Sequence, residues 1–103
     1  MQVAMVEQDI EILVDRIPQF RGNRVDLRKL ACGLAKAYFE QTNNADTLFP
    51  QDVVLGAIFL ACTKLGPHFS PLEFARAANV DLVAWPNVAE DMREHLRPML
   101  AVP

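Results

Sequence analysis

The residues best suited to bind a charged partner form a basic cluster in the first third of the chain. Between Asp15 and Lys36 there are six basic residues and two acidic ones, although the whole chain carries a net charge of −3. The start of a helix attracts anions, and arginine side chains strengthen that attraction. The cluster is therefore a candidate site for phosphate or for an acidic protein surface, and a solvated patch that balances the acidic residues before it is the alternative. Its four central members are Arg21, Arg24, Arg28 and Lys29.

The other reactive side chains show no spacing typical of a catalytic or metal site. Cys32 and Cys62 do not form a CxxC pair and each lies in an apolar helical pattern, so we expect two buried free thiols, with a disulfide or a metal site as the alternatives. His68 and His95 lack a carboxylate or thiol partner at a ligand spacing, and Ser70 is better explained as a helix cap. We therefore expect no enzyme activity, no metal and no cofactor.

Length, charge and hydrophobic content indicate which classes of protein are compatible with the chain. The chain has 103 residues, which predicts one domain over residues 1–103. A dedicated nucleic-acid binder is usually basic, so the negative net charge counts against that class. No leader pattern opens the chain, and we expect a cytoplasmic, intracellular protein without a membrane partner. At 51% hydrophobic residues, some apolar surface is expected to be covered by a protein partner or by a second copy of the chain.

These side chains must be positioned by helices, and the central one is predicted over Pro50–Gly66. From Val53 to Cys62 it has no charged residue, so no face is polar and we expect burial on all sides. The stretch is shorter than the roughly 20 residues that cross a bilayer. Its large side chains are expected to fill the gaps between neighbouring helices; they are Ile58, Phe59, Leu60 and Leu65.

Four further helices are predicted around the central one. Ser70 and Glu73 form a capping-box pattern with Pro71 at the first helical position, which marks the start of one of them. We expect Leu72, Phe74 and Ala75 to face inward on this short helix, and Pro98 to stop the last helix. The predicted ranges are 8–17, 25–41, 71–78 and 86–97. The chain therefore reads as an all-α bundle of five helices.

Trp85, the one tryptophan, precedes Pro86 in a predicted turn. An aromatic side chain at such a place either packs on the core or anchors a protein partner. The core position is the leading interpretation, and the partner anchor is the alternative.

Three stretches resemble the cyclin box and the related core of transcription factor IIB. Ile12–Arg16 (ILVDR) is similar to the first-helix signature of cyclins, with Arg16 in place of the usual tryptophan. Leu55–Leu65 (LGAIFLACTKL) resembles the third helix of both families, and Phe69–Val80 (FSPLEFARAANV) resembles the fourth. The resemblance spans nearly the whole chain and implies a single cyclin-like bundle around a buried third helix.

The resemblance also implies a function. In cyclins the lysine that matches Lys64 is followed by two glutamates, one of which contacts the kinase. In this chain the two positions after Lys64 are Leu65 and Gly66. We therefore expect a non-catalytic binding or regulatory adaptor, with Lys64 as a further candidate contact. The alternative is a transcription-factor-like module that contacts nucleic-acid backbone through Arg21, Arg24, Arg28 and Lys29.

Overall fold

The computed structural model describes residues 3–16, 24–41, 50–65, 70–82 and 84–100, and every regular element within these ranges is a helix. The predicted all-α fold is therefore confirmed. The five predicted helices are present, and a sixth, four-residue helix follows them. The elements in chain order are α1 (Val3–Asp15), α2 (Arg24–Gln41), α3 (Pro50–Leu65), α4 (Pro71–Ala78), α5 (Trp85–His95) and α6 (Arg97–Leu100).

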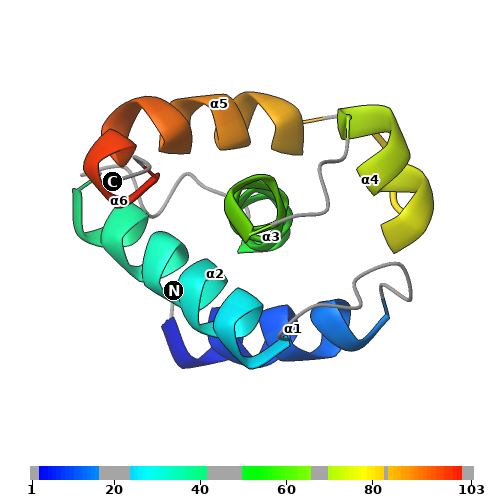
Figure 1. The fold of residues 1–103 in the computed structure, drawn as a ribbon, viewed down its shortest axis with the longest axis horizontal. Coiled ribbons are helices and arrows are strands. Elements are labelled where there is room, and N and C mark those ends of the chain that lie inside the picture. Colours follow the sequence, from blue (N-terminus) through cyan, green and yellow to red (C-terminus); the bar gives the residue numbers. More distant parts are fainter. Residues whose placement is uncertain (1–2, 17–23, 42–49, 66–69, 83, 101–103) are drawn as a thin grey trace.

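The helix α3 lies at the centre of the bundle. Figure 1 looks almost along its axis and shows the other helices arranged as a ring around it. From Val53 to Cys62 every residue of α3 is buried except Phe59, which is partly buried, so the prediction of a helix covered on all sides is confirmed. The prediction for Leu65 was wrong: its side chain is 45% exposed, because the last turn of α3 reaches the surface.

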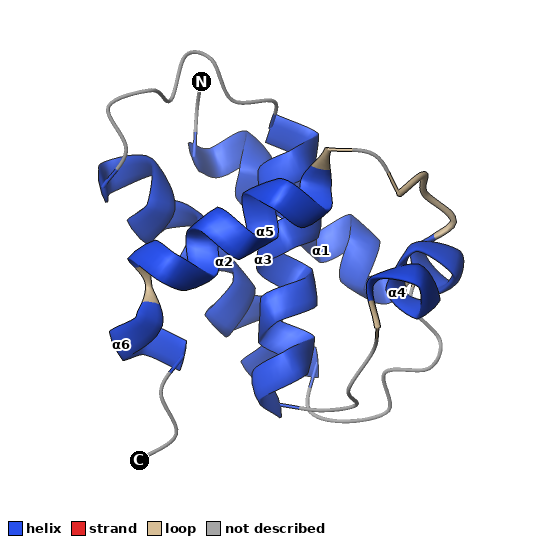
Figure 2. Ribbon diagram, turned by 90° about the horizontal axis from the view of Figure 1, so that it is seen from above, coloured by secondary structure: helices blue, strands red, loops and turns tan. Residues whose placement is uncertain are grey.

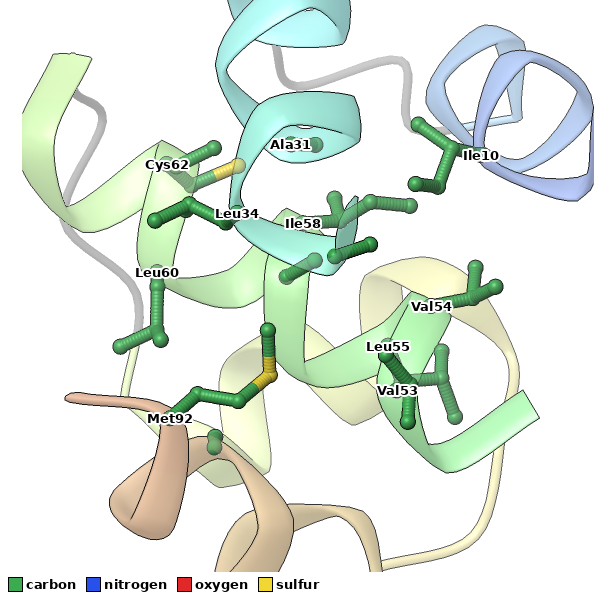
Figure 3. Close-up of a cluster of buried hydrophobic side chains, with 14 of the residues drawn as sticks. Ile10, Ala31, Leu34, Val53, Val54, Leu55, Ile58, Leu60, Cys62 and Met92 are labelled. Carbon is green, nitrogen blue, oxygen red and sulfur yellow. The ribbon is translucent and has the colours of Figure 1, made fainter. Parts of the chain in front are cut away.

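The neighbouring helices supply the apolar side chains that cover α3. Figure 3 shows Ile10 of α1, Leu34 of α2 and Met92 of α5 pointing toward the residues of α3. These side chains are 0% exposed, as the helical spacing of apolar residues along each segment predicts. Burial of this surface is the main favourable contribution to the stability of the fold.

A glycine sets the separation of α3 and α5. A Cβ atom at Gly56 would lie 3.2 Å from the Cα and N atoms of Ala89 and 3.2 Å from the Sδ atom of Met92. A side chain here would require α5 and the Met92 side chain to move by a few tenths of an ångström, because these contacts are tighter than usual. The pairing of Gly56 with Ala89 therefore lets the two helices approach closely.

The short helix α4 begins and ends where the sequence predicts. The Glu73 N–H donates to the Ser70 hydroxyl and the Ser70 N–H donates to the Glu73 carboxylate, which completes the capping box. Asn79 closes the helix in the left-handed region, with φ of 56°. The prediction that Leu72 faces inward was wrong, since it is 49% exposed. At about 100° per residue it lies on roughly the opposite side of the helix from the buried Phe74.

The end of the chain differs from the expectation in one respect. Pro98 was predicted to stop the last helix, but α5 already ends at His95, and Pro98 lies inside α6. A proline is tolerated there because N–H groups in the first turn of a helix have no intrahelical acceptor. Figure 2 shows α6 as a separate short helix after α5. Within the described residues, no helix combines the length and the apolar character that crossing a membrane requires.

Candidate partner-binding groove

The basic cluster is tied to the first helix. The Arg28 guanidinium donates to the Glu11 carboxylate at 2.6 Å, and Arg24 lies 4.0 Å from the Asp15 carboxylate. Lys29 is exposed on the same helix, and Arg21 lies outside the described residues. The pairing matches the alternative given for this cluster, a surface patch that balances the acidic first helix.

The two remaining candidate partner-binding residues, Trp85 and Lys64, differ in exposure. Trp85 is 1% exposed and packs its ring against Phe59 and Phe74, with centroid distances of 5.4 and 5.2 Å. Its indole N–H donates to the Asp81 carbonyl oxygen at 3.1 Å. Trp85 is therefore a core residue whose side chain is not available to a partner. Lys64 is exposed in the last turn of α3.

Sequence reasoning missed a groove formed by α1, the first half of α3 and the end of α4. It has a volume of about 780 Å³. Its apolar surface comes from three helices and includes Ile12, which is 48% exposed. The described residues that supply this apolar surface are Ile12, Leu13, Val54, Leu55, Ala77, Ala78 and Val80. A half-exposed isoleucine beside a hollow of this size is a feature typical of a binding surface.

A second hollow of about 370 Å³ continues the groove toward the segment between α4 and α5. The two hollows share lining residues, among them Leu55 and Val80, so they form one surface. We call this surface the α1–α3–α4 groove. Its second part adds two acidic residues, Asp52 and Asp81, and reaches the edge of Trp85.

The charges around the α1–α3–α4 groove are mostly negative. Among the residues that the structure describes, Asp9, Asp52 and Asp81 line it together with one cation, Arg16. Within the described ranges, none of these four side chains forms an ion pair, whereas Arg24 and Arg28 both do. Unpaired carboxylates beside an apolar surface favour a ligand that brings its own positive charge.

A second polar cluster joins α2 to α5. The Tyr38 hydroxyl donates to the Asp91 carboxylate at 2.5 Å, and burial, followed by this hydrogen bond, raises the pKa of Tyr38 above its usual value. The His95 Nδ1 lies 2.9 Å from the Asp91 carbonyl oxygen and 3.4 Å from the Asp91 carboxylate. The expectation that His95 lacks a carboxylate partner was wrong, because Asp91 lies four residues earlier on the same face of α5. That spacing was the available signal in the sequence, but the contact with Tyr38 depends on the packing of α5 on α2.

This cluster joins α2 to α5. Both Asp91 and His95 are exposed, and the His95 imidazole packs edge-on against the ring of Tyr38 with a centroid distance of 6.1 Å. No group of three or more metal-ligating side chains occurs among the described residues. His68 lies outside the part of the chain that the structure describes.

Neither Cys32 nor Cys62 forms a disulfide within the described part of the chain. Cys62 is buried, whereas Cys32 is only partly buried, so the expectation of burial holds fully for Cys62 alone. Burial raises the pKa of the Cys62 thiol to about 12. That thiol therefore stays protonated at neutral pH and is a poor nucleophile.

Comparison with protein-family models, with curated proteins and with solved structures finds no match for this chain. The resemblance to the cyclin box consequently stays a prediction from the residues quoted above.

Proposed function

We propose that this chain is a non-catalytic protein-interaction module whose α1–α3–α4 groove binds a segment of a protein partner. The observation that carries the proposal is the combination, on one surface, of a half-exposed Ile12, a hollow lined by both apolar and polar side chains, and three carboxylates that form no ion pair with another described residue. Apolar side chains of the partner would fill the hollow, and its basic side chains would meet Asp9, Asp52 and Asp81. The partner segment is therefore cationic and aliphatic in character.

The alternative function, contact with nucleic-acid backbone, has weaker support. It depends on Arg21, Arg24, Arg28 and Lys29 being available to phosphates. Of these, Arg28 donates a hydrogen bond to Glu11, and Arg24 lies 4.0 Å from the Asp15 carboxylate. Among the described residues, the groove itself carries three carboxylates and one guanidinium, which opposes a polyanion. We therefore favour a protein partner.

The proposal includes a regulatory or adaptor role of the kind that the cyclin-box resemblance implies, and a cytoplasmic location.

Binding of synthetic peptides of equal length tests the proposal. One series combines leucine with arginine and the other combines leucine with glutamate, and binding is measured by fluorescence anisotropy at low and moderate salt. We expect the arginine series to bind and the glutamate series not to bind. Ile12→Gln should weaken binding about tenfold, because it replaces an exposed apolar side chain at the hollow with a polar one.

Leu72→Gln is the matched control, since Leu72 is 49% exposed and Ile12 is 48% exposed, but Leu72 does not line the groove. Equal loss in both variants, or equal binding of both peptide series, would contradict the proposal. A pull-down from lysate with the wild type and Ile12→Gln then identifies the partner. Nucleic acid recovered at low salt from both proteins, and lost at moderate salt, would support the alternative instead.

Self-association is the second way to cover apolar surface, and light scattering over a range of concentrations tests it. A mass that rises with concentration in the wild type and not in Ile12→Gln would identify a second copy as the occupant of the groove. A mass of one chain at all concentrations would leave a different protein as the partner.

A further inference from the structure

We infer that Arg28 and Arg24 are positioning residues for the α1–α3–α4 groove: by pairing with Glu11 and Asp15 they fix the rotation of α1, which supplies one wall of the groove. This inference rests on the proposed function, because it assigns a role to the basic cluster in the same binding site. In this inference the two arginines orient α1 and do not contact the ligand directly.

The two ion pairs form a matched ladder between neighbouring helices. Glu11 and Asp15 are four residues apart on α1, and Arg24 and Arg28 are four residues apart on α2. Residues at this spacing lie on one face of a helix. Glu11 pairs with Arg28 and Asp15 pairs with Arg24, so the order is reversed along the two helices, as antiparallel neighbours require.

Three faces of α1 contact three different surroundings: the core, the arginines of α2, and the groove. Ile10 and Val14 point into the core, Glu11 and Asp15 meet the arginines of α2, and a third face lines the groove. At about 100° per residue, the centres of these faces lie roughly 100° to 140° apart around the helix. The residues of the third face are Asp9, Ile12, Leu13 and Arg16.

The two ion pairs influence which side chains of α1 face the groove. Burial of Ile10 and Val14 sets which face of α1 points into the core, because a large rotation would expose them, but it constrains a small rotation of the helix about its axis less strongly. The hydrogen bond from Arg28 to Glu11 is directional and limits that rotation. A rotated α1 would move Ile12 and Asp9 away from the positions that α3 and α4 complement.

Charge reversal separates this role from simple electrostatics. Arg28→Glu makes the protein more acidic, so long-range attraction alone should tighten binding of the cationic leucine–arginine peptide. If Arg28 positions α1, the same variant should instead bind that peptide about threefold more weakly. The exchanged pair, Glu11→Arg with Arg28→Glu, restores the net charge and the ion pair, and it should regain wild-type binding.

Lys29→Glu is the control, because it changes the net charge by the same amount on the neighbouring, exposed residue, for which no ion pair with another described residue is present. It should bind the cationic peptide as tightly as the wild type or more tightly. Tighter binding by Arg28→Glu, or no recovery in the exchanged pair, would overturn the inference.

Hydrogen exchange of the α1 amides gives a readout that does not depend on the peptide. We expect faster exchange in Arg28→Glu, wild-type exchange in Lys29→Glu, and recovery in the exchanged pair. If the wild type fails to bind the peptide but this exchange pattern is observed, the proposed function fails while the positioning of α1 stands. If exchange is the same in all four proteins, the positioning role is refuted whatever the peptide does.

Discussion

Tyr38 is the one tyrosine of the chain, and its hydroxyl links α2 to the Asp91 carboxylate of α5. Its pKa is raised first by burial, then by the hydrogen bond to Asp91 and the charge of that carboxylate. The unfolded chain therefore loses this proton at a lower pH than the folded protein does. The stability that comes from the neutral phenol is complete below the ordinary pKa of 10.0 and is lost as the pH rises above it.

We expect the unfolding free energy to fall more steeply above pH 10 in the wild type than in Tyr38→Phe. Chemical denaturation between pH 8 and about 11 measures it. Cys62 contributes a slope of the same sign, because its pKa is also raised, so the difference between the two proteins isolates the tyrosine. Parallel curves would show that Tyr38 titrates alike in the folded and unfolded chain.

Trp85 provides a prediction about packing. Trp85→Ala should lower the unfolding free energy by about 3 to 5 kcal/mol, because it opens a cavity between Phe59 and Phe74. Trp85→Phe should cost less, since it keeps an aromatic ring and loses only part of the volume and the hydrogen bond to Asp81. Denaturation followed by circular dichroism measures both. An unchanged midpoint in Trp85→Ala would indicate that the side chain is not part of the core.

At the scale of single elements, the capping box controls α4 and with it one wall of the groove. Ser70→Ala should reduce the unfolding free energy by about 1 kcal/mol, because the Glu73 N–H loses its acceptor. Ser70→Asp should stay close to the wild type, since aspartate also caps helices well. Urea denaturation compares the three proteins. If Ser70→Ala and Ser70→Asp lose equal stability, the serine hydroxyl is not acting as a cap.

A second prediction concerns the packing of α3 against α5 at Gly56. Alanine favours a helix interior over glycine by about 1 kcal/mol, so Gly56→Ala would be stabilising in an isolated helix. Here two of the three nearest atoms belong to the backbone of Ala89, which moves only if α5 moves. We expect a net loss of about 1 kcal/mol and a larger loss for Gly56→Val. Higher melting temperatures in calorimetry would show that α5 shifts without cost.

The helices themselves were the part of the structure most readily predicted from the sequence, although the first one, predicted over residues 8–17, spans Val3–Asp15. Local signals fix them: the capping box at Ser70 places the start of α4, and the apolar run from Val53 to Cys62 predicts a buried α3. Leu72 was assigned to the wrong face because eight residues provide only two turns, in which helical spacing is a weak guide. Pro98 was misjudged because a helix can restart at a proline as well as end before one.

The groove could not be predicted from local patterns, because its residues come from three helices that are distant in the sequence. Asp9, Asp52 and Asp81 each look like an ordinary acid near a helix end, and only the packing of α1, α3 and α4 brings them to one surface. The contact between Tyr38 and Asp91 has the same origin. The basic cluster was visible as a charge pattern, but its pairing with α1 required the arrangement of the two helices.

At the scale of the whole molecule, ligand binding and stability are linked. A ligand that binds only the folded protein raises the unfolding free energy by about 2.7 kcal/mol at a free concentration 100 times its Kd. We expect the leucine–arginine peptide to raise the melting temperature of the wild type in proportion to the logarithm of its concentration. Ile12→Gln should show the same curve shifted to higher peptide concentrations. An identical curve in both proteins would place the peptide elsewhere on the surface.

The burial of α3 from Val53 to Cys62 has a consequence for folding during synthesis of the chain. During synthesis α1 and α2 precede α3, but α5, which holds Ala89 against Gly56, is translated much later. Until α5 has left the ribosome, the side of α3 that carries Gly56 has no apolar cover. Nascent chains that end before Trp85 should therefore present this helix to chaperones, and the release of those chaperones should coincide with the arrival of α5.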